Sequence, residues 1–398
     1  MGSKLSFRKW LPLVGMAFAA FVFNTSEFMP IGLLTDIASD LGVSEARAGM
    51  LISVYAWCVA LLSLPLMLLV CRMEMKRLLL GIVALFIVSH VGSALAMGYY
   101  TLMASRIGVA CAHSIFWSIA APIAVRTVAE GRRALALSVV ATGSSIAMVV
   151  GLPLGRVIGL LIGWRMTFAI IAVVATIIFV YLLLTLPQLP SRGSFTVRKM
   201  PLLLKNRVLL GIFIMSVLFA TSHYTGYGYI EPFLGQVAGM SNEAVTATLI
   251  LFGASGMLGS WLFSRYYPRN RYRFIGLMAS GIAMLLLLLR LSALSVVTVV
   301  VLCVLWGLIS TAFNVAFQDC TIRYAPADAT AVAMSIYSGI FNLGIGTGAF
   351  IGGLVCTYSS IANIGYAGGM VAVLTLVYCC CRFFRNMRKA DKASTTTC

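Results

Sequence analysis

Twelve apolar stretches of roughly 20 residues each constrain this chain more than any other feature of its sequence. A bilayer core about 30 Å thick is crossed by about 20 helical residues, and a helix satisfies its own backbone hydrogen bonds in lipid. The stretches are 10–34, 46–70, 78–97, 100–124, 134–159, 166–187, 208–233, 244–265, 273–291, 294–317, 329–355 and 362–384. We therefore expect an all-α membrane protein with twelve transmembrane helices.

The composition excludes a water-soluble protein. Of the 398 residues, 61% are apolar and 10% are charged, whereas about a quarter of the residues in soluble domains are charged. Such a chain has too few polar side chains to cover a soluble core. A soluble enzyme, a disordered regulator and a secreted disulfide scaffold are excluded. The ten cysteines show no metal-ligand spacing, so we expect no metal site and no cofactor.

The basic residues orient the helices. The chain has 29 Lys and Arg against 11 Asp and Glu. With the N-terminus placed inside, 24 of the 29 fall in the inner loops and tails, and only Arg47, Arg165 and Arg290 fall outside. Cytoplasmic loops of membrane proteins collect Lys and Arg, which predicts that both termini are cytoplasmic. This distribution also removes the need for a nucleic-acid partner.

One longer connection divides the spans into two sets of six. Residues 188–207 are rich in proline and basic residues and are predicted to form a cytoplasmic linker. The expected domains are an N-terminal six-helix bundle over 1–187 and a C-terminal bundle with a short cytoplasmic tail over 208–398.

The two halves resemble each other at a shift of about 197 residues, which places Gly151 on Gly348 and Gly155 on Gly352. Small residues four apart let another helix approach closely, so helix packing explains each glycine alone. The repeat of the whole stripe indicates two pseudo-symmetric six-helix repeats. In transporters built this way, the substrate site lies between the halves near the midplane.

Four segments resemble the bacterial sugar efflux transporters of the drug:proton antiporter branch of the major facilitator superfamily. They are FNTSEFMPIGLL (23–34), SRIGVACAHSIFWSIAAPIA (105–124), GLPLGRVIGLLIGWRMTF (151–168) and SGIFNLGIGTGAFIGG (338–353). The similarity runs from about residue 10 to 385. It implies the major facilitator fold, located in the bacterial cell inner membrane. It also implies a functional monomer that exports sugars in exchange for protons.

Three superfamily motifs can be located. The motif of the 2–3 loop keeps Lys76 and Arg77 but lacks its glycines and aspartate, so its usual charge-relay role does not carry over. The arginine of the fourth span is Arg106. The antiporter motif of the fifth span is kept as Gly143, Gly151, Pro153 and Gly155, which by resemblance implies a bend and a leak-tight helix contact found in exporters.

Few ionisable residues fall within the spans, and each costs about 2.5–3.5 kcal/mol to insert. They are Glu27, His90, Arg106, His113, Arg156, His223 and Glu231. Asn24 shares the helix face of Glu27, and Arg106 is expected near the same depth. Desolvation favours the neutral acid and an arginine favours the carboxylate. Glu27 is therefore either a proton carrier with a movable partner or one half of a static brace.

The fourth span places Arg106, His113 and Trp117 on one stripe. His113 is expected to relay protons or to donate to a sugar hydroxyl, with Trp117 offering a flat face to a sugar ring. A hydrogen bond between helices explains His113 as well. His90 gives only a weak signal.

The seventh span presents His223, Tyr227 and Glu231 on one stripe, flanked by Tyr224. We expect this stripe to line the substrate cavity, although Glu231 also fits an ordinary carboxylate at a helix end. Asn314 in the tenth span and Asn342 in the eleventh lie on uncharged polar stripes. Their amides both donate and accept hydrogen bonds, which suits a polyhydroxy ligand.

These observations predict a non-enzymatic transporter whose partners are protons, a small-molecule sugar and the lipid bilayer. The expected function is proton-coupled efflux of small neutral sugars, such as arabinose-like pentoses or related glycosides, by alternating access. The alternative is a multidrug:proton antiporter on the same scaffold. A proton-coupled importer also stays open, because the direction of transport rests on the antiporter motif.

Overall fold

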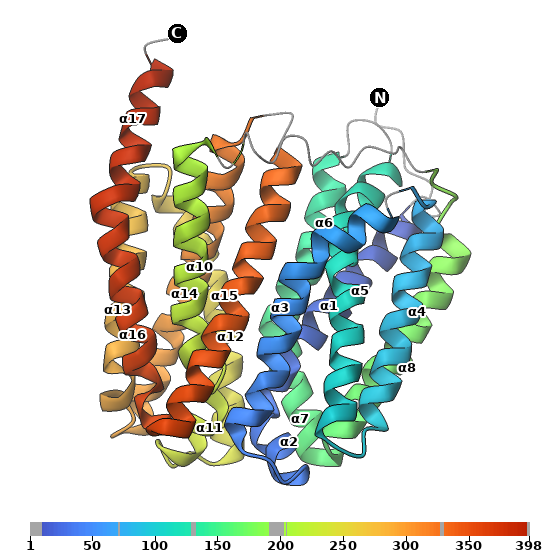
Figure 1. The fold of residues 1–398 in the computed structure, drawn as a ribbon, viewed down its shortest axis with the longest axis horizontal. Helices are drawn as coiled ribbons and strands as arrows, with labels where there is room; N and C mark the ends of the chain where they lie inside the picture. Colours follow the sequence, from blue (N-terminus) through green and yellow to red (C-terminus); the bar gives the residue numbers. More distant parts are fainter. Residues whose placement is uncertain are drawn as a thin grey trace. The chain divides into compact units, whose positions relative to one another are not determined.

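In the part of the chain that the structure describes, twelve helices are long and apolar enough to cross a membrane, which confirms the predicted all-α architecture (Figure 1). The computed structural model describes residues 10–70, 72–128, 133–190, 203, 205–326 and 330–395, and all regular elements in these ranges are helical. Most of the predicted linker and the first nine residues lie outside the described part.

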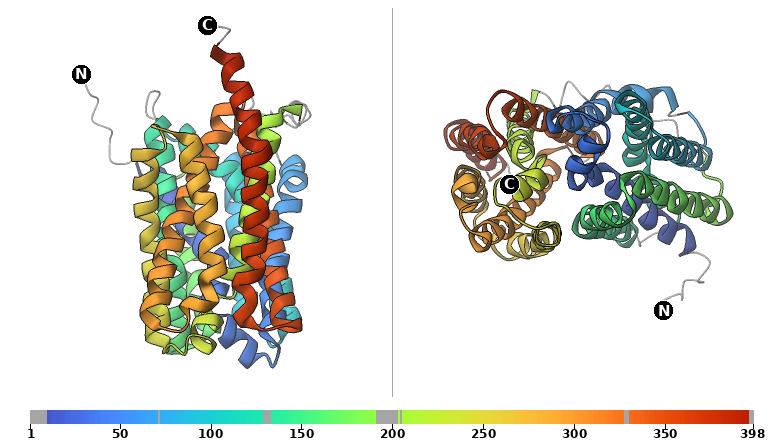
Figure 2. Two further views of the ribbon diagram at one scale, coloured as in Figure 1. Left: turned by 90° about the vertical axis from the view of Figure 1, so that its left-hand side faces the viewer. Right: turned by 90° about the horizontal axis from the view of Figure 1, so that it is seen from below.

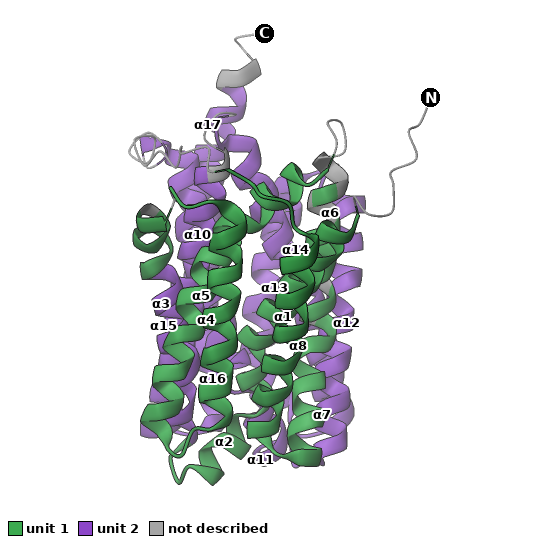
Figure 3. Cartoon of the chain, turned by 90° about the vertical axis from the view of Figure 1, so that its right-hand side faces the viewer, with its two compact units in different colours: residues 1–44, 61–195 green, residues 45–60, 196–398 purple. Residues whose placement is uncertain are grey.

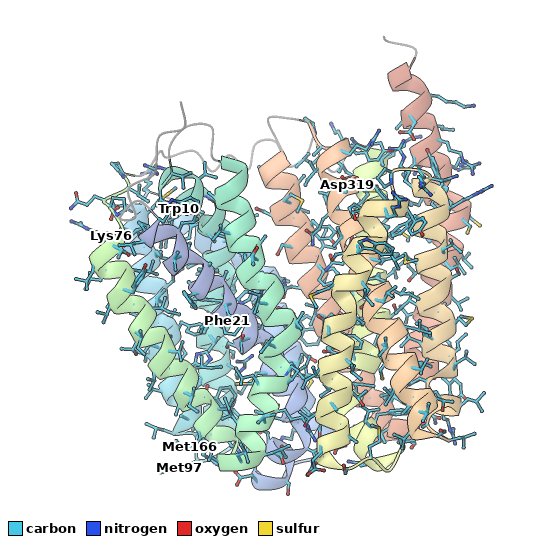
Figure 4. The ribbon with its side chains drawn as sticks, turned by 180° about the vertical axis from the view of Figure 1, so that it is seen from behind. Trp10, Phe21, Lys76, Met97, Met166 and Asp319 are labelled. Atoms are coloured by element: carbon cyan, nitrogen blue, oxygen red, sulfur yellow. The ribbon has the colours of Figure 1, made fainter. Side chains whose placement is uncertain are left out.

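The first six spans run through nine helical segments. They are α1 (Leu11–Gly32), α2 (Leu34–Asp40), α3 (Glu45–Val70), α4 (Met75–Ala94), α5 (Tyr99–Arg126), α6 (Arg133–Ile146), the π-helix η2 (Ala147–Gly151), α7 (Leu152–Ile162) and α8 (Trp164–Thr185). Figure 4 shows Trp10 and Lys76 towards one end of this part of the chain, and Met97 and Met166 towards the other. Consecutive spans therefore alternate in direction, as short connections require.

The last six spans follow the same plan. Their segments are α10 (Arg207–Tyr227), α11 (Ile230–Gln236), α12 (Asn242–Tyr266), α13 (Arg271–Ser292), α14 (Val296–Tyr324), α15 (Thr330–Tyr358), η4 (Ile361–Asn363), α16 (Ile364–Tyr378), the π-helix η5 (Cys379–Phe383) and α17 (Phe384–Thr395). Asn206 caps α10 by accepting from the Val208 and Leu209 backbone N–H groups, and Ser241 caps α12 in the same way from Ala244. The helices therefore begin where polar caps precede the apolar runs.

The chain forms two compact units, one made of residues 1–44 and 61–195 and the other of residues 45–60 and 196–398 (Figure 3). The helix α3 is shared, because its first 16 residues group with the second unit. There Trp57 donates a hydrogen bond to Thr347 (3.4 Å) and packs on the Phe350 ring. The compact units thus differ in this segment from the order of spans along the chain. A division into two six-helix bundles joined at 188–207 stays a prediction.

The internal repeat extends to aromatic packing within each unit. Phe23 of α1 stacks on Phe116 of α5, with ring centroids 4.2 Å apart and planes 9° from parallel. Phe219 of α10 stacks on Phe313 of α14 at 4.0 Å and 11°. These four residues correspond at the same shift of about 197 residues. Both units therefore place a stacked phenylalanine pair where their first and fourth spans meet.

Both repeats also break their first span near its end. The α1 helix ends at Gly32 and α2 begins at Leu34, while α10 ends at Tyr227 and α11 begins at Ile230. Hydropathy averages over many residues and therefore shows no interruption at either break, although Gly226, Gly228 and Glu231 surround the second one. Each break turns the chain at a corresponding place in the two repeats.

Candidate functional site

Glu27 and His113 form the central pair of the first unit. Glu27 lies on α1, His113 lies on α5, and His113 Nε2 is 3.6 Å from Glu27 Oε2. Their side chains are 9% and 2% exposed, respectively, so water contributes little to the solvation of either. An acid and a base that face each other inside a membrane span can exchange a proton between them.

Trp117 completes this pair from the next turn of α5. Its indole Nε1 donates a hydrogen bond to His113 Nε2 at 2.8 Å. Its ring meets the Phe116 ring edge-on, with centroids 5.2 Å apart, and Phe116 in turn stacks on Phe23. The predicted stripe of α5 therefore packs as a unit against α1.

Arg106 is held by the residue that precedes Glu27. Its Nη1 donates to the Ser26 carbonyl oxygen at 3.1 Å and to Ser26 Oγ at 3.5 Å. The guanidinium is 1% exposed and interacts electrostatically with Glu27. Arg106 thus lies beside the Glu27–His113 pair and favours a negative charge on Glu27.

His90 also lies next to Ser26 and Arg106. Its position as a single polar residue in an apolar run did not predict this contact. The side chain is fully buried, with Nε2 2.8 Å from Ser26 Oγ and Nδ1 2.9 Å from the Phe86 carbonyl oxygen. Because Ser26 also accepts from Arg106, the hydroxyl links α4, α1 and α5. We call Ser26, Glu27, His90, Arg106 and His113 the polar cluster of the first unit.

Asn24 extends the contacts of α1 towards α6 rather than towards α5. Its Nδ2 donates to Ser144 Oγ at 2.5 Å, one residue after Gly143. A Cβ added to Gly143 would overlap the Ala17 carbonyl oxygen. The α1 backbone therefore lies directly against this glycine.

The remaining antiporter-motif residues follow along the same contact. A Cβ at Gly151 would lie 2.7 Å from Thr25 Oγ1, and one at Gly155 would lie 2.5 Å from Met29 Cγ. The π-helix η2 ends at Gly151, and Pro153 stands at the start of α7. A π-helical turn redirects a helix, so the motif combines a change of helix geometry with close packing on α1.

Arg156 closes the end of α1. It is 1% exposed and its Nη1 donates to the Gly32 carbonyl oxygen at 2.8 Å, which satisfies a carbonyl left over where the helix ends. Beyond the break, desolvation raises the pKa of Asp36 and the nearby Arg156 opposes the rise. Further along, Asp40 forms an ion pair with Arg165. This pair stays partly exposed at the surface, with 35% of the Arg165 side chain and 46% of the Asp40 side chain accessible.

In the second unit, His223 lies among aromatic rings. Trp306 Nε1 donates to His223 Nδ1 at 3.0 Å. The Tyr227 ring stacks on the imidazole at 5.1 Å, and Tyr224 meets it edge-on at 4.8 Å. Phe252 stacks on Tyr227 at 4.6 Å. We call these five residues the aromatic cluster of the second unit.

The prediction that Glu231 continues the stripe of His223 and Tyr227 on one helix is wrong. The α10 helix ends at Tyr227, and Glu231 lies in the first turn of α11. Its side chain is nevertheless buried, with 5% exposed. A carboxylate in the first turn lies at the positive end of the helix dipole.

Asn314 and Asn342 occupy different surroundings in the same unit. Asn314 Oδ1 accepts hydrogen bonds from the Tyr337 hydroxyl at 2.7 Å and from Gln318 Nε2 at 3.2 Å, which links α14 to α15. Asn342 donates to the Ser338 carbonyl oxygen at 3.1 Å, within its own helix. The Asn314 network is thus a half-buried polar patch with hydroxyl and amide groups.

The structure therefore gathers Glu27, Arg106, His113 and Trp117 in one unit, with Asn24 directed to α6. In the other unit, His223, Tyr224 and Tyr227 pack together. Asn314 and Asn342 make their hydrogen bonds with other residues. Within the described residues, no three His, Cys, Asp or Glu side chains gather as a metal site would require.

Comparisons with known proteins agree with this architecture. Residues 16–346 match the model of the Major Facilitator Superfamily. Among solved structures, a POT family transporter in complex with 5-aminolevulinic acid is similar at a TM-score of 0.76 and 13% identity, covering 92% of this chain and 94% of that one. A bacterial homologue of the human lysosomal transporter Spinster, inward-facing and unoccupied, is similar at 0.72 and 18%, covering 97% and 98%.

These structural likenesses concern the fold, and the family match covers most of the sequence. The family match and the twelve spans together identify a multi-pass membrane transporter rather than an enzyme. The chain belongs to the Major Facilitator Superfamily.

Proposed function

We propose that this transporter exports small neutral sugars from a bacterial cell across the inner membrane in exchange for protons. The observation that carries the proposal is the buried Glu27–His113 pair, 3.6 Å apart, with Arg106 beside it. A proton bound there changes the charge inside a membrane span, where a change of one charge is costly. Protonation can therefore drive a change between two states of the protein.

In this proposal Glu27 cycles the proton, and Arg106 and His113 bias the cycle. Protonated Glu27 no longer attracts Arg106, which then keeps only the Ser26 oxygens as acceptors among these contacts. Deprotonated Glu27 attracts both Arg106 and a protonated His113. The transport cycle follows the alternating access of two-repeat transporters.

The sugar class rests on the uncharged polar groups and on the resemblance in sequence. Asn314, Gln318 and Tyr337 supply an amide oxygen, an amide and a hydroxyl in one network. Such groups match hydroxyls that both donate and accept, and Trp117 supplies a flat ring. We expect Asn24, Asn342, Tyr224 and Glu231 to contribute further polar contacts to the substrate.

A multidrug:proton antiporter is the second candidate, favoured by the aromatic cluster around His223. Flat apolar drugs stack on such rings. The low number of acidic residues in the spans argues against cationic drugs, because a buried cation requires an opposite charge.

Purified protein in liposomes with an imposed pH gradient separates these candidates. With an acidic lumen, a sugar antiporter accumulates radiolabelled pentose, and a protonophore abolishes the accumulation. Accumulation of a flat, uncharged aromatic drug instead of pentose would establish the multidrug alternative. Pentose accumulation that requires an alkaline lumen would show proton-coupled import.

A further inference from the structure

The last helix of the second unit carries a basic groove that the transport proposal does not use. The groove has a volume of about 580 Å³ and is lined at one end by Cys380 and Cys381. Its other end is lined by Arg385, Arg388, Lys389 and Lys392. All six of these residues are exposed, so the groove is a surface feature with four positive charges.

The position of the groove along the helix sets its depth in a bilayer. The last span runs over Ile361–Lys392, 32 residues. At 1.5 Å per residue, about 20 residues cross a core about 30 Å thick. The core therefore ends near the two cysteines, and the four basic residues lie at the level of the lipid headgroups. Figure 2 shows α17 extending past the ends of its neighbours in this unit.

Half-buried polar contacts and one buried ring hold α17 in place. Asp391 accepts a hydrogen bond from the Tyr324 hydroxyl at 2.7 Å, and it is also bound by Tyr272 and Arg271. Phe383 is fully buried on the inward side of the last span. Asp391 thus anchors α17 to α13 and α14, and Arg271 balances its charge.

An apolar groove continues the basic one along α13. It has a volume of about 390 Å³ and is lined by Tyr272, Gly276, Leu277, Phe384 and Arg388, among others. Phe384 and Arg388 line both grooves. The Arg388 guanidinium lies 5.5 Å from the centre of the Tyr272 ring. From Tyr272 to Leu277 the lining descends into the span, as an acyl chain would.

We propose that these two grooves bind one anionic phospholipid. Its phosphate lies among Arg385, Arg388, Lys389 and Lys392, and an acyl chain follows α13 past Gly276. Basic residues at the end of a span attract anionic headgroups, and guanidinium groups pair with phosphate oxygens in bidentate geometry. The site concerns lipid binding and does not depend on which solute is transported.

Titration of the detergent-purified protein with dioleoyl phosphatidylglycerol, read by native mass spectrometry, tests the proposal. We expect discrete binding of this lipid and much weaker binding of dioleoyl phosphatidylcholine. The double variant Arg385→Gln/Lys389→Gln should bind about fivefold more weakly per charge removed, about 25-fold in total. The control Arg265→Gln/Arg323→Gln removes two exposed charges outside both grooves and should bind as the wild type does.

A second measurement uses the wild-type chain alone, so it holds if a variant fails to fold. Alkylation of Cys380 and Cys381 by a polar maleimide, read on their peptide, should slow when phosphatidylglycerol is added. Phosphatidylcholine and inorganic phosphate should leave the rate unchanged. Equal protection by phosphatidylcholine, equal protection by free phosphate, or equal lipid binding by the test and control variants would overturn the proposal.

Discussion

The indole Nε1 of Trp117 donates to His113 Nε2 at 2.8 Å, on the same side of the imidazole that faces Glu27 Oε2 at 3.6 Å. An indole N–H only donates, so Nε2 offers its lone pair and cannot carry a proton while this bond exists. A proton that arrives at Nε2 breaks the Trp117 bond and creates an ion pair with Glu27. Trp117 and Glu27 therefore compete for one nitrogen atom.

This competition predicts the effect of Trp117→Phe. Loss of one hydrogen bond is worth about 1 kcal/mol. This changes the equilibrium between protonated and neutral His113 about fivefold, and we expect proton-coupled transport to slow by about that factor. The measurement is the initial rate of pentose uptake at a fixed pH gradient. The control is Trp164→Phe, since the Trp164 indole nitrogen has no hydrogen bond to any described residue. Equal rates in both variants would show that the Trp117 bond has no role.

Glu27→Gln separates proton coupling from substrate binding. Glutamine keeps the size of the side chain and cannot release a proton, so uptake driven by the pH gradient should fall more than tenfold. Exchange of labelled for unlabelled pentose without a gradient should persist. Glu243→Gln is the control, because Glu243 is exposed in the first turn of α12. Gradient-driven uptake at the wild-type rate in Glu27→Gln would exclude Glu27 as the proton carrier.

Ser26→Ala tests whether the polar cluster depends on the link between His90 and Arg106. The hydroxyl contacts both residues, and hydrogen bonds between membrane helices are worth about 0.6 kcal/mol on average and up to about 1.7. We expect unfolding in detergent to become easier by about 1 kcal/mol. Ser114→Ala should change stability less, because Ser114 Oγ donates only to the Cys111 carbonyl oxygen of its own helix.

Glu74 predicts a pH dependence of stability outside the spans. Its carboxylate accepts hydrogen bonds from the backbone N–H groups of Lys76, Arg77 and Leu189, which cap α4 and tie it to the segment that follows α8. Desolvation raises the pKa of Glu74, but these three hydrogen bonds outweigh it and the net pKa is lowered. A lowered pKa stabilises the fold above the unfolded value of about 4.3 and loses that effect as the pH falls through the folded value.

The measurement for Glu74 is thermal unfolding of the wild type and Glu74→Ala between pH 7 and pH 3. At neutral pH the variant should be less stable by about 1 kcal/mol, as for loss of a helix cap. The difference should shrink in acid. A difference that stays constant over this range would show that the charge of Glu74 has no part in the cap.

The sequence predicted the spans well because hydropathy is a local property. All twelve spans are present, although α14 extends to Tyr324 instead of residue 317. The breaks at Leu33 and Tyr229 do not show in hydropathy, because hydropathy averages over many residues, although Gly226, Gly228 and Pro232 flank the second break. For this reason the hydropathy pattern places Glu231 on the helix of His223, whereas the structure does not.

The contacts of the candidate site were less predictable, because they join residues far apart in the chain. His90 looks the same in sequence whether it faces lipid or Ser26, 64 residues away. Likewise, nothing local pairs Trp306 with His223. Spacing within one helix was more informative: it predicted that His113 and Trp117 share a stripe of α5 and that His223 and Tyr227 share a stripe of α10, and both pairs are in contact.

Gly143→Ala tests the close approach of α6 to α1. The added Cβ would overlap the Ala17 carbonyl oxygen, which is backbone and cannot turn aside. Overpacking typically destabilises by about 1–3 kcal/mol, so we expect a loss of that size and slower transport. Gly81→Ala is the matched control, because nothing lies within 4 Å of its added Cβ on α4. There alanine should stabilise the helix slightly through its higher propensity. If Gly143→Ala were as stable and as active as Gly81→Ala, α6 and α1 would not need to touch at this glycine.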